Sequence, residues 1–328
     1  MSLLDYEHWG RETNPALSGW FTVASSVSIS ADGQGPYSIG RYVQPSGALG
    51  RQSVFPNTTS NLYAQFHMFV TGPGSDHLFS WYDANNAQCS LRIDNTGVIT
   101  LVRGTAGTTI ATSGTPAVAW NAWYFIQLRV TIGAAGSYEL RINGQTIFSG
   151  TGNTQQTANN YANGWNLRWA RYANLIMYDG TGNAPNTWTP ETVIYTSLPN
   201  GAGATTGWTP SAGANWQCVD EQPNNGDTDY VAAASAPLTD TYACPAPAPS
   251  GVIPYAVGVE VVARKDDAGT NDLDLVVRSG SDYASGVPGT LTTNWQRFRR
   301  IWDLDPNTGL AWTLANAQAV QPGVRRTA

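Results

Sequence analysis

Pairs of aspartates separated by one residue are the side chains of this sequence whose spacing comes closest to a metal site. The three pairs are Asp227 with Asp229, Asp272 with Asp274, and Asp303 with Asp305. On an extended chain, residues two apart point to the same side, so each pair could offer oxygen ligands to Ca²⁺. No glycine-anchored calcium loop surrounds any of them. Solvated strand faces explain these aspartates better, and we expect neither a metal nor another cofactor.

Glycoside hydrolysis would require two carboxyl groups about 5 to 9.5 Å apart on either side of the scissile bond. The strand motif E-x-D-x-x-E, which is usual in β-sandwich glucanases, is absent from the sequence. The six glutamates, none of which begins such a motif, are Glu7, Glu12, Glu139, Glu191, Glu221 and Glu260. The acid pair of a glycoside hydrolase is therefore missing.

The histidines, serines and glycines show no other catalytic arrangement. His8, His67 and His77 have neither zinc-ligand spacing nor a cysteine nearby, and we expect His67 and His77 to be strand residues. No serine occupies a G-x-S-x-G elbow, and no glycine-rich loop precedes a helix as a phosphate site would demand. The sequence therefore predicts a protein that is not an enzyme.

Aromatic side chains offer a different chemistry, because sugar rings stack their apolar C–H faces on tryptophan and tyrosine. Trp81, Tyr82 and Trp169 fall on predicted strands, and the alternation directs Arg92 and Arg129 away from the predicted core. A face that carries Trp81, Arg92 and Trp169 is the candidate glycan site. The alternative is that these tryptophans fill the interior of a β-sandwich.

These side chains must be positioned by a sheet, and residues 122–149 give its clearest signal. The stretch alternates inward and outward side chains through two turns, which predicts three neighbouring antiparallel strands. Tyr124, Ile126, Leu128, Val130 and Ile132 share one face of the first strand, which we expect to pack, while the other face is free. Asn143-Gly144 is a dipeptide that a tight hairpin turn prefers. Further strands are predicted at residues 62–71, 77–82, 87–93, 98–102 and 108–112, and two more within residues 165–178.

The composition favours an all-β protein of two domains. The chain has 328 residues, of which only 12% are charged, with 34 Gly, 13 Trp and 15 Tyr. Such a composition suits short strands and tight turns and disfavours long amphipathic helices. The length exceeds that of most single cores, so we expect a first domain at residues 1–190 and a smaller β domain at residues 191–328.

Residues 254–264 and 273–278 are the best strands of the second domain. We expect them to form a hairpin through residues 265–269, with Val257, Val259 and Val261 set against Leu273, Leu275 and Val277. A short helix is predicted at residues 313–320, beginning after Thr313 and stopped by Pro322-Gly323.

Charge and hydropathy exclude two classes of partner. The net charge is -6, Lys265 is the only lysine, and no basic stripe suits nucleic acid. No segment approaches the ~18 to 20 apolar residues of a membrane span, and the first ten residues do not resemble an export signal. We therefore expect synthesis in a cytoplasm and no membrane insertion.

Three cysteines, Cys89, Cys218 and Cys244, are too few and too widely spaced for a disulfide framework. We interpret them as buried thiols. Cys218 and Cys244 could still pair if they lie on adjacent strands and the protein ends up outside a cell.

The first ~190 residues resemble the concanavalin A-like and laminin G-like jelly rolls. The resemblance is carried by the segments LYAQFHMFV and FSWYDANNAQCSLRIDNTGVITLVRG and by the run from WYFIQLRV to YELRINGQ, in that order. It implies a β-sandwich of two curved antiparallel sheets, one of which presents a concave face. A second, smaller β-sandwich would follow.

A narrower resemblance covers residues 178–326. The segments YDGTGNAPN, SLPNGAGATTGWTPSAGANWQCVDEQPNNGDTDYV, RKDDAGTNDLDLVVRSG and DPNTGLAWTLANAQAVQPGV look like the two-domain structural proteins of tailed bacteriophages and gene transfer agents. This resemblance implies a non-enzymatic virion component, such as a fibre, spike or tail-tip protein, made in the host cytoplasm. Its partners would be other virion proteins and copies of itself in a trimer or ring, with a bacterial surface polysaccharide as a further option.

Two other functions compete with this interpretation. One is a carbohydrate-active enzyme, a glucanase or lyase on a jelly-roll fold, and the missing acid pair argues against the glucanase. The other is a free secreted glycan-binding lectin, which the absence of an export signal in the sequence weakens. The position on a particle, in the head or in the tail, stays open.

Overall fold

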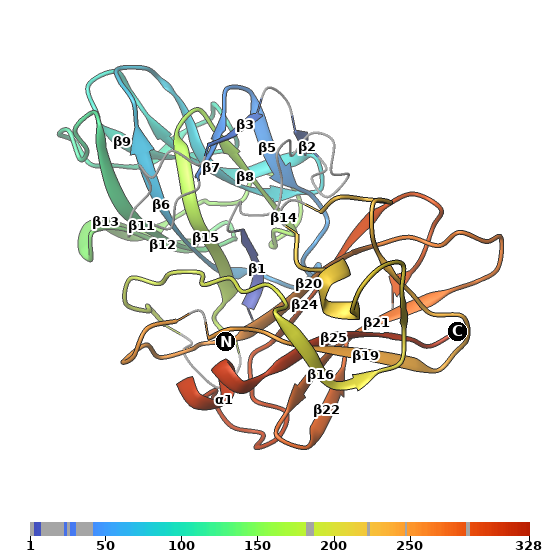
Figure 1. Cartoon of the computed structure of the whole chain (residues 1–328). Helices are drawn as coiled ribbons and strands as arrows, with labels where there is room; N and C mark the ends of the chain where they lie inside the picture. Colours follow the sequence, from blue (N-terminus) through green and yellow to red (C-terminus); the bar gives the residue numbers. More distant parts are fainter. Residues whose placement is uncertain are drawn as a thin grey trace. The chain divides into compact units, whose positions relative to one another are not determined.

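The structure is a computed structural model that describes residues 3–7, 23–24, 27–30, 42–181, 187–221, 224–246, 248–286 and 289–328. His8 lies outside these residues. The described chain is almost entirely β and divides into two compact units, which meet in the sequence between Ile194 and Tyr195. In Figure 1 the first unit runs from blue to yellow-green and the second from yellow to red.

Two antiparallel sheets form the first unit. Sheet A has eight strands, in the order β13 (Gln145–Gly152), β12 (Gly136–Ile142), β11 (Ala122–Thr131), β6 (Asn61–Val70), β15 (Arg171–Asp179), β4 (Tyr42–Pro45) and β3 (Val27–Ser30), with β1 (Leu3–Glu7) beside β15. Sheet B has seven strands, in the order β10 (Thr109–Thr112), β9 (Ile99–Arg103), β8 (Asn86–Ile93), β7 (Asp76–Asp83), β14 (Gly164–Arg168), β5 (Ala48–Arg51) and β2 (Val23–Ala24). Consecutive strands such as β7 and β8 are neighbours in places, but β6 beside β15 and β5 beside β14 come from distant parts of the sequence, as in a jelly roll.

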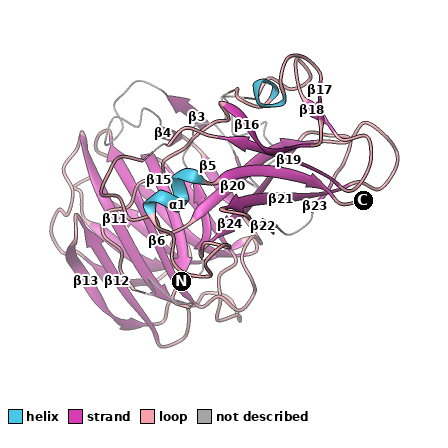
Figure 2. Ribbon diagram, turned by 60° about the horizontal axis from the view of Figure 1, so that its bottom comes forward, coloured by secondary structure: helices cyan, strands magenta, loops and turns pink. Residues whose placement is uncertain are grey.

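The three strands expected in residues 122–149 are confirmed as β11, β12 and β13, which lie side by side in Figure 2. Val130 pairs with Tyr138 and Ile126 with Ile142, so the register is continuous along the hairpin. Asn143 and Gly144 adopt φ of 50° and 79°, as the tight turn between β12 and β13 requires.

The two sheets stack through a core of alternate side chains. Phe66 from β6 stacks on Phe79 from β7 with ring centroids 5.6 Å apart, and Phe79 meets Trp81 edge to face at 4.8 Å. Tyr172 from β15 is fully buried, and its hydroxyl lies 2.7 Å from the carbonyl oxygens of both Leu78 and Arg168, donating to one at a time. The polar tip of this side chain therefore ties sheet A to two strands of sheet B.

A smaller sheet and a two-stranded ribbon form the second unit. Sheet C has six strands, in the order β16 (Gly201–Thr206), β19 (Leu238–Ala243), β25 (Gln321–Arg326), β21 (Asp272–Ser279) and β22 (Asp282–Ser285), with β23 (Gly289–Thr290) beside β21. The ribbon pairs β20 (Val257–Ala263) with β24 (Gln296–Trp302), and β17 (Thr209–Pro210) pairs with β18 (Val231–Ala232). The helical segments are η3 (Asn215–Cys218) and α1 (Leu314–Ala319), drawn in cyan in Figure 2.

The predicted hairpin of the second unit is wrong in its pairing. β20 pairs with β24, and β21 pairs with β25, β22 and β23, so the two expected partners belong to different sheets. Their apolar side chains still meet, because Val259, Leu273 and Val277 belong to one buried cluster. The alternation identified the inward faces correctly but not the neighbouring strands.

The predicted helix is confirmed as α1. The α1 helix begins after Thr313, whose hydroxyl accepts a hydrogen bond from the Asn316 amide at 3.1 Å, and it ends before Pro322.

Cys89 is buried, and burial raises the pKa of its thiol to about 12. Cys218 donates a hydrogen bond to the Ala212 carbonyl at 2.9 Å, and no disulfide joins it to Cys244. None of the helices in the described ranges has the length and hydrophobicity that crossing a membrane requires.

Replacing Trp81 with Ala should lower the free energy of unfolding of the first unit by about 3 to 5 kcal/mol, because it leaves a large cavity between the sheets. The indole N–H has no hydrogen-bond partner, so the loss is one of packing alone. Arg92→Ala on the neighbouring strand β8 is the control and should change stability by no more than about 0.5 kcal/mol. Chemical denaturation followed by tryptophan fluorescence measures both, and an equally small effect of the two substitutions would contradict the core position of Trp81.

Candidate functional site

The outer face of sheet A is covered by residues 187–194, which we call the strap. Gln127 Nε2 donates to the Thr189 carbonyl at 2.9 Å, and the Thr189 hydroxyl donates to Gln65 Oε1 at 2.7 Å. Gln65 and Gln127 are consequently only 2% and 3% exposed. The expectation that this face of the sheet is free is therefore wrong, because the chain's own strap satisfies the polar side chains that the alternation turns outward.

His67 is held under the strap by two partners. Its Nε2 lies 2.7 Å from Glu191 Oε1, and the Asn174 side-chain amide lies 3.2 Å from its Nδ1. An amide nitrogen can only donate, so Nδ1 accepts and Nε2 carries the hydrogen that goes to Glu191. Burial lowers the pKa of the His67 imidazole, and the carboxylate of Glu191 only partly opposes this effect. His67 is a strand residue, as expected, and a neutral hydrogen-bonding group.

Trp188 closes the other part of the same face. The guanidinium of Arg141 lies 4.5 Å from the centroid of the Trp188 ring and that of Arg129 lies 5.9 Å from it. The ring also meets Tyr63 edge to face at 5.4 Å. Glu139 engages both arginines, at 2.7 Å from Arg141 Nε and 3.4 Å from Arg129 Nη2. Arg129, which does point away from the core, is thus occupied within the protein.

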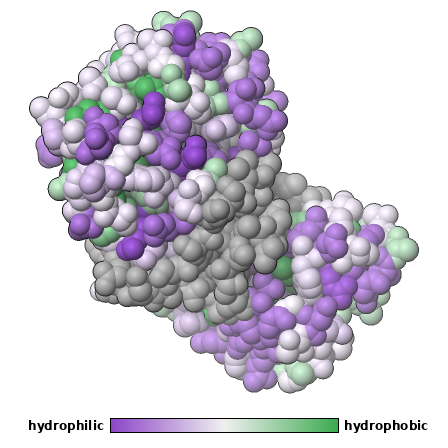
Figure 3. Space-filling view, turned by 90° about the horizontal axis from the view of Figure 1, so that it is seen from above, coloured by the Kyte–Doolittle hydropathy of each residue, from purple (hydrophilic) through white to green (hydrophobic). Residues whose placement is uncertain are grey.

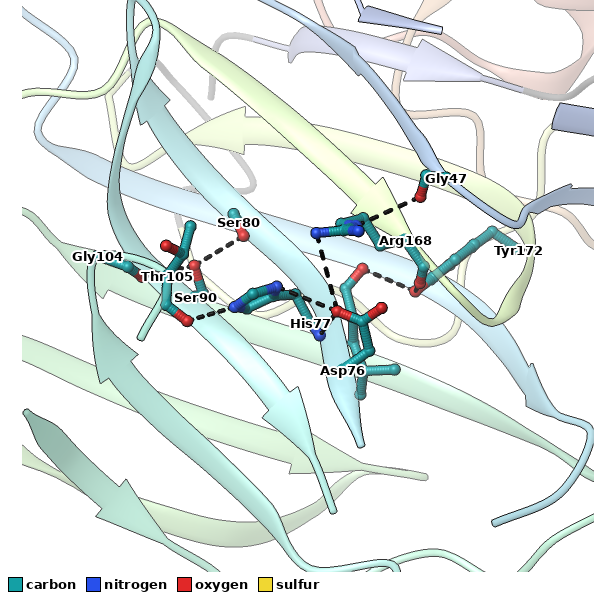
Figure 4. A network of polar contacts seen from close by, with 10 residues as sticks. Gly47, Asp76, His77, Ser80, Ser90, Gly104, Thr105, Arg168 and Tyr172 are labelled. Carbon is teal, nitrogen blue, oxygen red and sulfur yellow. Dashed lines mark hydrogen bonds and ion pairs between the residues drawn. The ribbon is translucent and has the colours of Figure 1, made fainter. Parts of the chain in front are cut away.

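The outer face of sheet B carries a second polar network, shown in Figure 4. Ser80 donates to Ser90 at 2.8 Å, and Ser90 donates to the Gly104 carbonyl at 2.6 Å. His77 lies between Asp76, 3.2 Å from its Nδ1, and the Thr105 carbonyl, which its Nε2 contacts. In Figure 4 Asp76, His77 and Arg168 point toward one another. The network positions this end of strands β7 and β14.

Two arginines on this face retain unused hydrogen-bond donors. Arg168 has 40% of its side chain exposed, and its two contacts are long: Nη1 lies 3.9 Å from Asp76 Oδ1, and Nε donates to the Gly47 carbonyl at 3.4 Å. Arg92 on β8 lies opposite His77 in the register and forms no hydrogen bond or ion pair with any residue of the described ranges. Tyr82 is half-buried, and burial raises the pKa of its phenol while the charge of Arg168 opposes the rise.

The three residues of the predicted glycan site do not lie on one face of the sheet. Trp81 is fully buried between the sheets, so it cannot touch a sugar, and the alternative that it fills the sandwich is the one found. Arg92 points outward as expected. Trp169 stands half-buried in the turn after β14 with φ of 68°, and its ring packs so closely on Gly74 that a Cβ there would lie 2.4 Å from it.

Strand alternation separates Trp81 from Arg92 once the pairing of β7 with β8 is known. Trp81 pairs with Cys89 in the register of β7 and β8, and Arg92 lies three residues after Cys89 on the same strand. An odd spacing on a strand places two residues on opposite faces. The same alternation turns Arg168 outward, because it follows the inward Leu167 on β14; Arg168 was not among the predicted site residues.

The described residues offer no metal site, since no group of three or more His, Cys, Asp or Glu side chains among them is arranged to hold an ion. Of the strands of sheet B, only β7 carries carboxylates, Asp76 and Asp83, one at each end. The chemistry available on the face is therefore hydrogen bonding and charge from guanidinium groups, beside the aromatic ring of Tyr82; the half-buried Trp169 also packs against the core cluster. Such donors suit hydroxyl, carboxylate and phosphate groups.

Neither a protein-family model nor a curated protein matches the sequence. Among solved structures, an endo-β-1,4-glucuronan lyase from the fungus Trichoderma reesei is 10% identical with a TM-score of 0.39, over 54% of this chain and 95% of that one. A galectin from Caenorhabditis elegans is 9% identical with a TM-score of 0.31, over 41% and 91% of the two chains. A sialidase from Trypanosoma rangeli is 11% identical with a TM-score of 0.32, over 41% of this chain and only 24% of its own length. At these scores and identities none of the three assigns a function to this chain.

Acidification should weaken the first unit through His67. Because burial lowers the pKa of this imidazole below its ordinary value near 6.5, the stability it contributes is present above about pH 6.5 and is lost as the pH falls toward the lowered pKa. The difference in free energy of unfolding between pH 7.5 and pH 5 should therefore shrink in His67→Gln. His77→Gln on sheet B is the matched control. If the difference between the two pH values were unchanged in His67→Gln, the loss of stability could not be assigned to His67.

Proposed function

We propose that this chain is a non-enzymatic structural protein of a tailed-bacteriophage particle, a fibre, spike or tail-tip component, and that its first unit contacts a host surface glycan through the outer face of sheet B. The particle role is supported by the resemblance of residues 178–326 to two-domain virion proteins. On this proposal the chain is made in the host cytoplasm and reaches the cell surface as part of the particle.

The observation that carries the glycan contact is the pair of arginines with spare donors. Arg92 on β8 and Arg168 on β14 flank β7 on one face of sheet B, with Trp169 directly after Arg168. Neighbouring strands lie about 4.8 Å apart, so the two backbones are separated by roughly 10 Å. A sugar unit or two span such a distance, with their polar groups on the guanidiniums and an apolar face on Tyr82 or Trp169.

Binding is favoured over hydrolysis by the placement of the carboxylates on this face. Asp76 and Asp83 stand at the two ends of β7, an eight-residue strand, and are therefore about 23 Å apart along it. Asp83 is also buried and accepts hydrogen bonds from Thr157 at 2.7 Å and Asn159 at 2.9 Å. No bond of a bound sugar can have both carboxyl groups within the ~5 to 9.5 Å that hydrolysis needs.

Contacts with other virion proteins and with copies of this chain would fall on the second unit. Figure 3 shows hydrophilic and hydrophobic side chains interspersed on the described surface. The large apolar side chains that the described residues leave exposed all belong to residues 195–328, with Ile253 at 73% and Leu310 at 68%. Exposed aromatic and aliphatic groups of this kind serve as anchors in protein interfaces, which suits a trimer or a ring.

Removing one guanidinium should weaken glycan binding without unfolding the protein. Arg92→Ala should lower the affinity for purified host surface polysaccharide about tenfold or more, since a hydrogen bond to a charged group contributes about 1.5 to 3 kcal/mol. Biolayer interferometry on immobilised polysaccharide measures the effect. Arg141→Ala on the outer face of sheet A removes the same charge elsewhere and should leave the affinity unchanged.

The same polysaccharide preparation tests the absence of catalysis. Incubation with the wild-type protein should release no reducing ends, the product of hydrolysis. It should also generate no ultraviolet-absorbing unsaturated sugar, the product of lyase action. Either product would replace the proposal with the carbohydrate-active enzyme. Equal affinity of Arg92→Ala and the wild type would move the glycan contact away from sheet B.

The particle role has its own test. Mass spectrometry of purified particles should find the intact chain at several copies per particle, and culture medium cleared of particles should contain none. The isolated protein should run as a trimer or larger ring in light scattering coupled to gel filtration. Detection of the chain in the cleared medium alone would favour a free secreted lectin.

A further inference from the structure

A cavity of about 340 Å³ opens within the second unit, lined by β20 and by strands β19, β21 and β25 of sheet C. Its inner part is apolar and includes Val261, Leu273 and Leu291, which belong to or pack against the buried cluster of this unit. Trp208 and Trp295 also line it. The volume lies at the lower end of the roughly 300 to 1,000 Å³ typical of small-molecule sites.

The polar part of the cavity is acidic. Seven carboxylate side chains line it, against three cationic ones, which are Arg264, Lys265 and Arg326. All three cations are engaged. Arg264 lies 2.8 Å from Asp227, Lys265 donates to the Gly269 carbonyl, and Arg326 donates to the Ala233 carbonyl at 2.7 Å. Glu260, one of the seven, is paired with Arg297 and Arg299, and Asp227 is paired with Arg264. The described lining then holds five other carboxylates against two cations, Lys265 and Arg326, so it keeps a net negative charge that favours a positive guest.

Two acceptor oxygens in the lining are buried without a hydrogen-bond partner. They are Asn271 Oδ1 and Asp272 Oδ1, at the start of β21. Asn271 is 6% exposed, and its amide nitrogen donates to Asp267 Oδ1 at 2.7 Å, which fixes the oxygen as the unpaired atom. Leaving a buried acceptor unpaired is unfavourable, so a donor from outside the chain would be stabilised here.

Glu221 and Asp229 also line the cavity and lie close enough to share a side-chain hydrogen bond. Burial, and then the nearby negative charges of Asp229 and Asp220, raise the pKa of the Glu221 carboxyl. Like charges held together in this way are relieved either by a proton or by a cation. The acidic lining and the unpaired acceptors of Asn271 and Asp272 thus favour the same kind of guest.

We propose that this cavity binds a small organic cation, an ammonium group carried on a compact apolar body. The N–H groups would donate to Asn271 and Asp272, while the body would lie against Val261, Leu273 and Leu291. The net negative charge of the described lining disfavours carboxylates and phosphates of the same size. The site is independent of the glycan contact on sheet B.

Three probes of nearly equal shape and different charge test the proposal on the full chain. 2-Phenylethylamine should bind with a dissociation constant of about 1 mM or tighter, as expected of a ligand with few atoms. 2-Phenylethanol and 3-phenylpropionate should bind at least about tenfold more weakly. Isothermal titration calorimetry measures all three, and the wild-type comparison requires no variant to fold. Equal binding of the three probes, or none of the amine, would overturn the proposal.

A pair of charge-removing variants locates the amine. Asp272→Asn should weaken 2-phenylethylamine about tenfold, whereas Asp282→Asn, an exposed aspartate on β22 outside the cavity lining, should not. Thermal unfolding without ligand checks that both variants are folded. If the two substitutions weakened the amine equally, the ammonium group would be responding to the net charge of the protein and the assignment to the cavity would be lost.

Discussion

The hydroxyl of Tyr172 is the constraint on which the first unit depends, because it satisfies a buried polar tip by reaching from sheet A to the backbone of sheet B. Its acceptors are the carbonyls of Leu78 and Arg168. Leu78 follows His77 on β7, and Arg168 presents the exposed guanidinium of the candidate glycan face. The interior contact that fixes the spacing of the sheets therefore also fixes the backbone from which the outward polar groups project.

The two faces of the sandwich use polar side chains in opposite ways. On sheet A, Gln65, His67 and Gln127 are turned outward but are paired with the strap, so their hydrogen-bonding capacity is spent inside the protein. On sheet B, Arg92 and Arg168 keep much of their hydrogen-bonding capacity. Burial of polar groups without partners is costly, so the buried polar groups of sheet B, Ser80 and Ser90, are paired as well, whereas the partly exposed Arg92 and Arg168 can keep donors for a ligand.

Alternation in the sequence predicted the faces of strands well and their neighbours poorly. It gave the β11 to β13 hairpin, whose turn Asn143-Gly144 is local and chemically specified. It failed for β20 and β21, because nothing local distinguishes two strands that pair from two that pack face to face. Trp81 shows the same limit at the site: aromatic type suggested a sugar platform, while burial depends on the second sheet, which arrives from distant residues. The strap over sheet A had no periodic signal at all.

The strap has a mechanical consequence. Residues 187–194 are the last of the first unit before the chain enters the second, so tension applied at Tyr195 would act first on the hydrogen bond from the Ile194 amide to Asn174 and then on those of Glu191 and Thr189, before it reached the strands. These contacts are individual hydrogen bonds at successive residues, so they would break one after another. A linkage of this kind lets the chain lengthen under load while the sandwich stays folded.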